Sequence, residues 1–312
     1  MKIVFMGTPR AAVASLGRVL DAGHEVVAVY TQPDRPAGRG NKLAASAVKE
    51  FAIEHGLSEI RQPLKIKTDE AFEEFRSLDA DAAVVVAYGR ILPERWLNAF
   101  PAGAINVHFS LLPKYRGAAP VNWAIANGEA ETGVTTMKMD AGLDTGDILL
   151  QRATPIGADE TAVELMDRLA IVGAELLIET LDNLDRITPR RQDDSLATLA
   201  PIMKKEDGRI DWTMSAREIA NRVRAFQPFP TSYTFADGVR YTIWRAAACE
   251  TGIQDHSPQP GTVIEASGGS LSIACGSGGV LRVDEIQPEG KRRMAVRDFL
   301  NGAKLRAGML LG

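Results

Sequence analysis

The segment Ala82–Ala87 restricts the possible folds of this chain more than any other stretch of its sequence. Its residues, AAVVVA, form a continuous apolar run without polar alternation, which is typical of a strand buried on both faces of a parallel sheet. Further strand-like runs lie at Lys2–Met6, Glu25–Tyr30 and Ala104–Val107, and helical patterns separate them. This order predicts a Rossmann-like α/β domain with an open, mostly parallel sheet. Such sheets bind ligands at the carboxyl ends of their strands.

The second half of the chain follows a different pattern. Apolar residues from Val163 to Leu181 recur at three- and four-residue spacing and predict a long helix. Ser215 and Glu218 form an S-x-x-E capping box that opens a shorter helix. The short β runs that follow are separated by turn residues, which predicts a small OB-like β-barrel. We therefore expect an α/β domain over residues 1–184, a linker over 185–207 and a barrel domain over 208–312.

Composition and termini exclude several classes of protein. Of the 312 residues, 45% are hydrophobic and 24% are charged, so the chain can bury a sizeable core. No apolar stretch approaches the ~20 residues that span a bilayer, and the N-terminus lacks the cleavage pattern of a signal peptide. We expect a cytoplasmic protein without membrane contact. The two cysteines, Cys249 and Cys275, form neither a C-x-x-C pair nor a zinc cluster, so no metal site is expected.

The net charge of −4 is unevenly distributed along the chain. Residues 1–183 hold 18 Lys and Arg against 25 Asp and Glu, a charge of −7, whereas residues 184–312 hold 18 against 15, a charge of +3. A basic C-terminal part is a mild indication of nucleic-acid contact, although solvated surface charge explains the difference nearly as well.

The first strand is followed by Gly7-Thr8-Pro9, which invites comparison with nucleotide-binding loops. Neither G-x-G-x-x-G nor the Walker phosphate loop is present. A tight turn from strand to helix is therefore a better interpretation than a phosphate site, and a dinucleotide-dependent dehydrogenase is disfavoured.

Three polar residues, two at the end of a predicted strand and one in a loop, suggest acyl-transfer chemistry. Asn106 and His108 are two positions apart, so on a strand their side chains face the same side. Asp144 lies in the loop Ala141–Asp147, between two glycines. Asn106 could donate to a developing oxyanion, which is typically worth ~3–4 kcal/mol in the transition state. His108 could donate a second hydrogen bond or move a proton, and Asp144 could orient His108 or accept a proton from an attacking amine.

The surrounding motif is more specific than these three residues alone. The run Asn106-x-His108-x-Ser110-Leu111-Leu112-Pro113, continued by Tyr115-Arg116-Gly117 and combined with the GLDTGD loop, resembles the 10-formyltetrahydrofolate-dependent formyltransferases. The resemblance implies that Asn106, His108 and Asp144 are catalytic and that the co-substrate is 10-formyltetrahydrofolate. It also implies that the folate site is lined by two stretches, whose members are Ser110, Leu111, Leu112, Pro113, Val86, Tyr88, Gly89 and Ile91. Phe109 departs from the usual pattern of the family and adds a bulky ring between His108 and Ser110.

The same resemblance suggests the acceptor amine. The basic stretch Gln32–Leu43 is similar to the insertion that family members acting on methionyl-tRNA direct toward the acceptor stem, and Val223–Pro230 is similar to the start of their C-terminal domain. Initiator methionyl-tRNA is therefore the expected partner of a protein that acts as a monomer. The residues expected to contact tRNA are Arg35, Arg39, Lys42, Lys204, Lys205, Arg222 and Arg224.

Two alternatives remain open at this stage. A related enzyme could formylate the amine of a sugar nucleotide, which a comparison of charged tRNA with amino-sugar nucleotides as acceptors would reveal. A catalytically silent tRNA-binding protein could also keep the fold. The intact Asn106, His108 and Asp144 argue against this second alternative.

Overall fold

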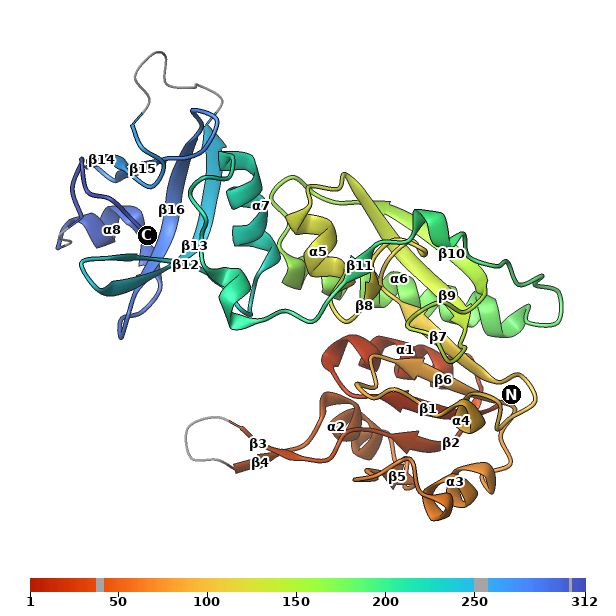
Figure 1. The fold of residues 1–312 in the computed structure, drawn as a ribbon. Helices are drawn as coiled ribbons and strands as arrows, with labels where there is room; N and C mark the ends of the chain where they lie inside the picture. Colours follow the sequence, from red (N-terminus) through yellow and green to blue (C-terminus); the bar gives the residue numbers. More distant parts are fainter. Residues whose placement is uncertain (38–41, 250–257, 303–304) are drawn as a thin grey trace. The chain divides into compact units, whose positions relative to one another are not determined.

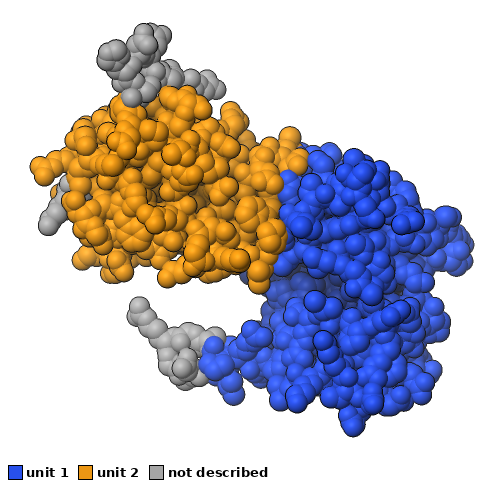
Figure 2. Space-filling view, in the orientation of Figure 1, with its two compact units in different colours: residues 1–120, 131–155, 166–200 blue, residues 121–130, 156–165, 201–312 orange. Residues whose placement is uncertain are grey.

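The computed structural model describes residues 1–37, 42–249, 258–302 and 305–312 (Figure 1). The chain divides into two compact units, coloured separately in Figure 2. The first consists of Met1–Pro120, Glu131–Pro155 and Met166–Ala200. The second consists of Val121–Ala130, Ile156–Leu165 and Pro201–Gly312.

A seven-stranded sheet in the order β10-β9-β7-β6-β1-β2-β5 forms the centre of the first unit. Its strands are β1 (Lys2–Gly7), β2 (Glu25–Tyr30), β5 (Ile60–Arg61), β6 (Ala82–Val86), β7 (Ala104–His108), β9 (Glu131–Lys138) and β10 (Ile148–Pro155). The five strands from β7 to β5 are parallel, and β9 and β10 extend the sheet in antiparallel pairing. Strand β6 is buried along its whole length, as the apolar run predicts. The Rossmann-like, mostly parallel sheet is thereby confirmed.

Helices cover both faces of this sheet. They are α1 (Arg10–Asp21), α2 (Ala47–Glu54), α3 (Asp69–Arg76), α4 (Glu94–Leu97) and α6 (Ala162–Asp182), of which residues 166–182 belong to this unit. Phe75 of α3 and Trp96 of α4 share a buried cluster with Val4 and Met6 of β1. Because successive residues of a strand point to opposite faces, α1, which packs beside Gly7 and Phe5, lies on the other face. This arrangement leaves the loops after the strands free to carry chemistry.

Short elements complete the first unit. They are β3 (Arg35–Ala37) paired with β4 (Lys42–Ala44), β8 (Arg116–Gly117) paired with β11 (Leu199–Ala200), and the 3-10 helix η1 (Asp194–Leu196). The pairing of β8 with β11 brings residues 185–200 of the expected linker into the first unit. Only residues 201–207 of that stretch belong to the second unit.

The second unit is built around a six-stranded antiparallel sheet. Its elements are η2 (Lys205–Gly208), α7 (Ala216–Ala225), β12 (Ser232–Ala236), β13 (Val239–Cys249), β14 (Val263–Ser267), β15 (Ser270–Ala274), β16 (Val280–Pro288), β17 (Met294–Ala295) and α8 (Val296–Leu300). The strand order is β12-β13-β16-β15-β14, and β17 pairs with β16. Helix α7 begins at the expected capping box, in which Ser215 N donates to a Glu218 carboxylate oxygen at 2.9 Å.

The end of the chain closes this sheet toward a barrel. Leu310 forms an antiparallel bridge with Thr262, beside β14, at one edge of the strand order. Gly312 N donates to the carbonyl of Phe235 on β12, at the other edge, over 3.0 Å. The C-terminal residues thus satisfy backbone groups of both edge strands, which removes the exposed edges that an open sheet would leave. The predicted small barrel is confirmed, and this closure is its physical basis.

Helix α5 (Pro120–Ala126) lies far from the second unit in sequence, yet most of it belongs there. The Asn122 side chain donates to the carbonyl of Ala225, at the end of α7, over 2.7 Å. Trp123 Nε1 donates to the carbonyl of Pro201 over 2.9 Å. These contacts link two parts of the chain that sequence patterns alone assign to different domains.

Candidate active site

Asn106 and His108 lie at the carboxyl end of β7 and are almost fully buried. The register of β7 against β6 pairs Asn106 with Val85, and Val85 belongs to the face covered by α3 and α4. Asn106 Nδ2 donates to the Val85 carbonyl over 3.1 Å, which fixes the orientation of the amide, since a carbonyl can only accept. Asn106 Oδ1 is buried and has no hydrogen-bond partner among the described residues. A buried acceptor without a partner is costly, and because almost none of its surface is accessible, it can meet an N–H group of a ligand only after the side chain moves.

His108 is held between a backbone carbonyl and a carboxylate. Its Nε2 lies 2.9 Å from the carbonyl oxygen of Tyr115, and its Nδ1 lies 3.6 Å from Asp144 Oδ2. Because the carbonyl can only accept, Nε2 carries a proton, and Nδ1 is the nitrogen that faces the carboxylate. This geometry is suited to holding a proton on Nδ1 or passing one to Asp144 through a water molecule.

Asp144 reaches His108 from a loop that several hydrogen bonds hold. Its Oδ2 accepts from the backbone N–H of Gly117 over 2.8 Å. The side chain of Gln192 donates to the carbonyls of Asp144 and Gly146, over 2.8 and 2.7 Å. A Cβ on Gly146 would lie 1.9 Å from the Lys138 carbonyl oxygen, so no other residue fits there without a shift of the backbone. Sequence reasoning missed Gln192, because one glutamine in a polar stretch carries no signal.

Three residues of this region adopt the left-handed backbone conformation that favours glycine. They are Ala87, Tyr115 and Asp144, with φ of 47°, 62° and 52°. Each such residue costs of order 1–3 kcal/mol and persists only where the surrounding structure holds it. Tyr115 presents its carbonyl to His108, Asp144 presents its carboxylate, and Ala87 opens the loop after β6. Such strain is concentrated at functional sites, which supports an active site here.

The stretch from Val86 to Ile91 begins at the last residue of β6, and side chains of Thr8 and Gln32 bind its backbone. Val86 and Tyr88 are buried, and burial raises the pKa of the Tyr88 phenol. The Tyr88 carbonyl accepts from Thr8 Oγ1 and from Gln32 Nε2, over 3.0 and 3.1 Å. By contrast, the side chain of Ile91 is 81% exposed.

Gly89, with a φ of 85°, turns the chain within this loop. The exposed Ile91 beside it is an apolar side chain that the fold leaves open to a ligand. Leu143, in the Asp144 loop, is similarly 58% exposed.

The side chains of Ser110–Pro113 are largely engaged within the protein. Ser110 Oγ donates to the Lys114 carbonyl over 2.6 Å, and Leu112 is buried against Met137 and Ile148. Leu111 packs against Gly133 of β9. Pro113 is half-buried. This stretch therefore supports the site mainly through its backbone.

Phe109 does not enter the site. It alternates with His108 along the strand direction, and its ring is buried beside Gly173 of α6, on the opposite face of the sheet. A Cβ on Gly173 would lie 3.4 Å from Phe109 Cε1 and 3.0 Å from Val107 Cγ1, so this glycine leaves the room that the ring occupies. The departure from the family pattern is thus accommodated on the side away from Asn106 and His108.

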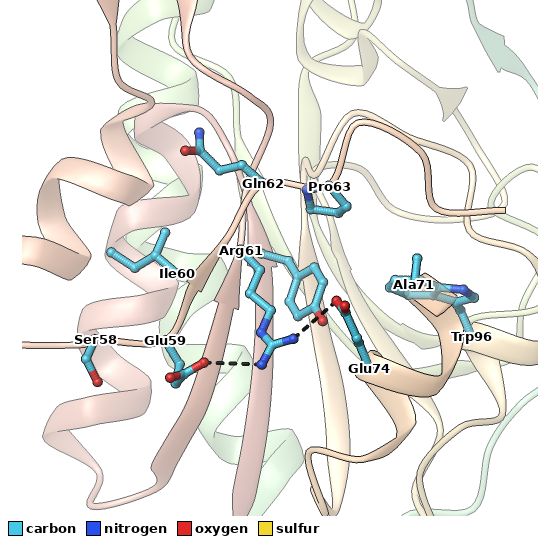
Figure 3. A pocket seen from close by; sticks show the side chains of 10 residues that line it. Ser58, Glu59, Ile60, Arg61, Gln62, Pro63, Ala71, Glu74 and Trp96 are labelled. Atoms are coloured by element: carbon cyan, nitrogen blue, oxygen red, sulfur yellow. Dashed lines mark hydrogen bonds and ion pairs between the residues drawn. The ribbon is translucent and has the colours of Figure 1, made fainter. Parts of the chain in front are cut away.

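A cavity of about 420 Å³ lies elsewhere in the first unit, beside β5 and α3 (Figure 3). None of the predicted catalytic or folate residues lines it. Figure 3 shows Arg61 between Glu59 and Glu74, and its guanidinium nitrogens lie 3.3 and 3.4 Å from those carboxylates. The two acidic partners compensate the charge of Arg61, so the cavity offers no unpaired cation for an anionic substrate.

The residues predicted to contact tRNA fall into several groups. Arg35 is exposed on β3, whereas Arg39 and the side chain of Lys42 lie outside the described residues. The hairpin of β3 and β4 follows Asp34, whose carboxylate accepts from Lys49 Nζ over 2.7 Å. This hydrogen bond lowers the pKa of Asp34.

In the second unit, Lys204 and Lys205 are exposed and Arg222 is half-buried. The guanidinium of Arg224 donates to the carbonyls of Gly157 and Glu160 over 3.1 and 3.0 Å, and burial lowers its pKa. Arg224 therefore has a structural task within the second unit, while the two lysines remain open to a ligand.

The sequence also predicts that the protein has no metal site and no membrane contact. In the described ranges, no three His, Cys, Asp or Glu side chains are grouped so that they could hold a metal ion. A search of the same residues for helices long and apolar enough to cross a membrane finds none.

A parallel sheet that carries an amide, an imidazole and a carboxylate at its loop edge is an arrangement suited to acyl transfer without a protein nucleophile. The Formyl transferase family matches residues 1–181, and the C-terminal domain of formyl transferases matches residues 202–304. The chain belongs to the formyl transferase family.

Relatives that match over the full chain carry a more specific name. A methionyl-tRNA formyltransferase of Geobacter sulfurreducens is 49% identical over 100% of this chain and 97% of its own length. One of Citrifermentans bemidjiense is 50% identical over 100% of this chain and 96% of its own.

Solved structures show the same fold at lower identity. A sugar 3N-formyl transferase, WlaRD, has a TM-score of 0.68 and 22% identity, covering 94% of this chain and 99% of its own. An N-formyltransferase from Helicobacter canadensis has a TM-score of 0.68 and 21% identity, covering 91% and 98%.

Proposed function

We propose that this enzyme transfers the formyl group of 10-formyltetrahydrofolate to the α-amine of initiator methionyl-tRNA. The observation that carries the proposal is the identity of 49% and 50%, over essentially the full length of both chains, to relatives named methionyl-tRNA formyltransferase. The sugar-modifying relatives share the fold at 22% and 21% identity and carry no argument about the acceptor.

Catalysis requires removal of a proton from the methionyl ammonium, because only the neutral amine can attack. Free α-amines titrate at about 7.7–8.0, so a modest base suffices. The amine nitrogen then attacks the formyl carbon, the carbonyl oxygen gains negative charge, and the bond from the formyl carbon to the folate nitrogen breaks. The amine loses its proton, and the folate nitrogen receives one.

We propose a part in this reaction for each of the three residues. Asn106 has one N–H on the Val85 carbonyl and a second that can donate to the oxyanion, while its unpartnered Oδ1 can accept from the amine after the side chain moves. His108 can stabilise the oxyanion or move a proton, and Asp144 can receive the amine proton directly or through water. No covalent bond to the protein is needed at any step.

The folate is proposed to occupy the loop edge between the Val86–Ile91 stretch and the Asp144 loop. A pterin has a flat apolar face and polar edges, so it suits an apolar site with backbone groups at its rim. Ile91 and Leu143 are exposed apolar side chains at this edge. The backbone of Ser110–Pro113 is proposed to form the adjoining wall.

Transfer RNA is proposed to contact Arg35, Arg39 and Lys42 on the first unit and the exposed Lys204 and Lys205 on the second. Lysine and arginine on phosphates supply most of the affinity for a nucleic acid. Arg222 is a further candidate, and Arg224 is the weakest of the set because its guanidinium is already bound. We place the enzyme in the cytoplasm and propose that it acts as a monomer.

The decisive experiment is incubation with 10-formyltetrahydrofolate and methionylated initiator tRNA, followed by detection of formylmethionine after hydrolysis of the ester. Amino-sugar nucleotides serve as competing acceptors in parallel reactions. Formylation of a sugar amine without formylation of tRNA would overturn the proposal. Tight tRNA binding without turnover would indicate a silent tRNA-binding protein.

A further inference from the structure

The amide of Gln192 joins the segment after α6 to the loop that carries Asp144. Its side chain is almost fully buried, with 5% of the residue exposed. Nε2 uses both of its hydrogens on backbone carbonyls, one of Asp144 at 2.8 Å and one of Gly146 at 2.7 Å. Gln192 therefore binds the backbone of the loop on both sides of Thr145, although it lies 48 positions after Asp144.

The other end of the same amide is bound just as fully. Gln192 Oε1 accepts from Arg116 Nε and Nη2 over 3.0 and 2.8 Å, and Arg116 is itself buried. Arg116 Nη2 also donates to Asp194 Oδ1 over 2.8 Å. A flip of the amide would place Oε1 against two carbonyls and the NH₂ group against a guanidinium. The network therefore admits one orientation.

Two neighbouring residues of β8 thus control Asp144 by different routes. Gly117 N–H binds the carboxylate directly, and Arg116 orients the amide that binds the Asp144 backbone. Asp144 has a φ of 52°, in the left-handed region, which aspartate tolerates better than most residues but at a cost that hydrogen bonds to its backbone help to offset. Without Gln192, the carbonyls of Asp144 and Gly146 would lose their side-chain donor, and the Gly117 N–H would be left to hold the carboxylate near His108.

We propose that Gln192 is a positioning residue for formyl transfer, which acts by holding the Asp144 carboxylate toward His108. The inference rests on the proposed function of Asp144. Gln192 does not contact the reacting atoms, so its effect passes through Asp144 and appears in turnover more than in substrate binding.

A double-mutant cycle tests this directly on the full-length enzyme. Gln192→Ala removes the whole amide, and Gln192→Glu keeps its size and its contact with Arg116 but places an oxygen against the two carbonyls. Both changes are made in the wild type and in Asp144→Asn. Ser195→Ala, in the nearby 3-10 helix η1, is the control, because among the described residues the Ser195 hydroxyl bonds to Asp193 alone.

We expect Gln192→Ala and Gln192→Glu to lower kcat by ~100-fold, the loss typical of a displaced catalytic group, with KM for both substrates unchanged. Both changes leave buried polar groups around position 192 without their partner and should also lower Tm, so kcat is measured well below the Tm of each variant. In the Asp144→Asn background, the same changes should lower kcat by less than ~2-fold, since contributions through one residue are not additive. Ser195→Ala should turn over as the wild type does.

Equal losses in both backgrounds would overturn the inference, because Gln192 would then act independently of Asp144. A loss of kcat that is fully explained by a smaller folded fraction at the assay temperature would also overturn it. Wild-type turnover of Gln192→Glu would overturn it too, because the two donors would then be dispensable. If Asp144→Asn itself keeps full turnover, the proposed role of Asp144 fails first, and the cycle identifies that failure separately.

Discussion

Replacement of Asn106 by leucine separates the catalytic task of this residue from its structural one. Leucine has nearly the same size, but it removes the amide that donates to the Val85 carbonyl and the buried Oδ1 that has no described partner. Loss of the donor to the buried Val85 carbonyl costs about 1–3 kcal/mol of folding free energy, whereas removal of an unsatisfied buried acceptor returns about 1–3 kcal/mol. The free energy of unfolding should therefore change by no more than about 2 kcal/mol in either direction.

Turnover, unlike stability, should fall sharply. An oxyanion donor is worth about 3–4 kcal/mol in the transition state, so kcat should fall by ~10²–10³. Initial rates of formylation at saturating folate and charged tRNA give kcat, and urea unfolding of the same preparations gives stability. Asn98→Leu is the matched control, because Asn98 is exposed at the end of α4 and its side chain, within the described part of the chain, bonds to the Glu94 carbonyl alone. Its turnover should equal that of the wild type.

The reasoning would be refuted by near-normal turnover of Asn106→Leu. It would also be refuted if stability fell by more than about 2 kcal/mol, since the Oδ1 of Asn106 would then have a partner that stabilises the fold.

Two further substitutions and one chemical modification test the packing inside each unit. Gly173→Ala gains about 1 kcal/mol of helix propensity within α6, but its Cβ would lie 3.0 Å from Val107 Cγ1, and overpacking costs about 1–3 kcal/mol. We therefore expect the free energy of unfolding to fall by up to about 2 kcal/mol, which urea unfolding measures. Ser215→Ala removes the capping box shared with Glu218 and should cost about 1 kcal/mol by the same measurement. Burial raises the pKa of Cys275 to about 12, so its thiol is protonated at pH 8 and should resist alkylation by iodoacetamide in the native state.

The predictions for Gly173 and Cys275 each have a contrasting position in the chain. Gly302→Ala, where a Cβ would have open space, should leave stability unchanged or slightly higher. The half-buried Cys249 should be alkylated before Cys275. Equal effects of Gly173→Ala and Gly302→Ala, or rapid native labelling of Cys275, would contradict the packing described above.

The sequence by itself determines the elements of the fold and the chemistry of the motif. The run Ala82–Ala87 predicts a buried parallel strand, and β6 is buried throughout. Ser215 and Glu218 predict the start of α7, which begins at that box. The spacing of Asn106 and His108 predicts that they share one face of a strand, and the register of β7 agrees. These features depend on residues within a few positions of one another, so a short window of sequence contains them.

Only the tertiary structure decides which polar groups meet. Asp144 approaches His108, Gln192 donates to the backbone of the Asp144 loop, and Arg224 donates to two backbone carbonyls. Each of these contacts joins residues 36 or more positions apart. Phe109 is harmless to the site because α6 brings Gly173 over its ring. Buried hydrogen-bonding groups must find partners, but periodicity and propensity are silent on which distant group supplies them. The tertiary structure determines which distant groups become hydrogen-bond partners.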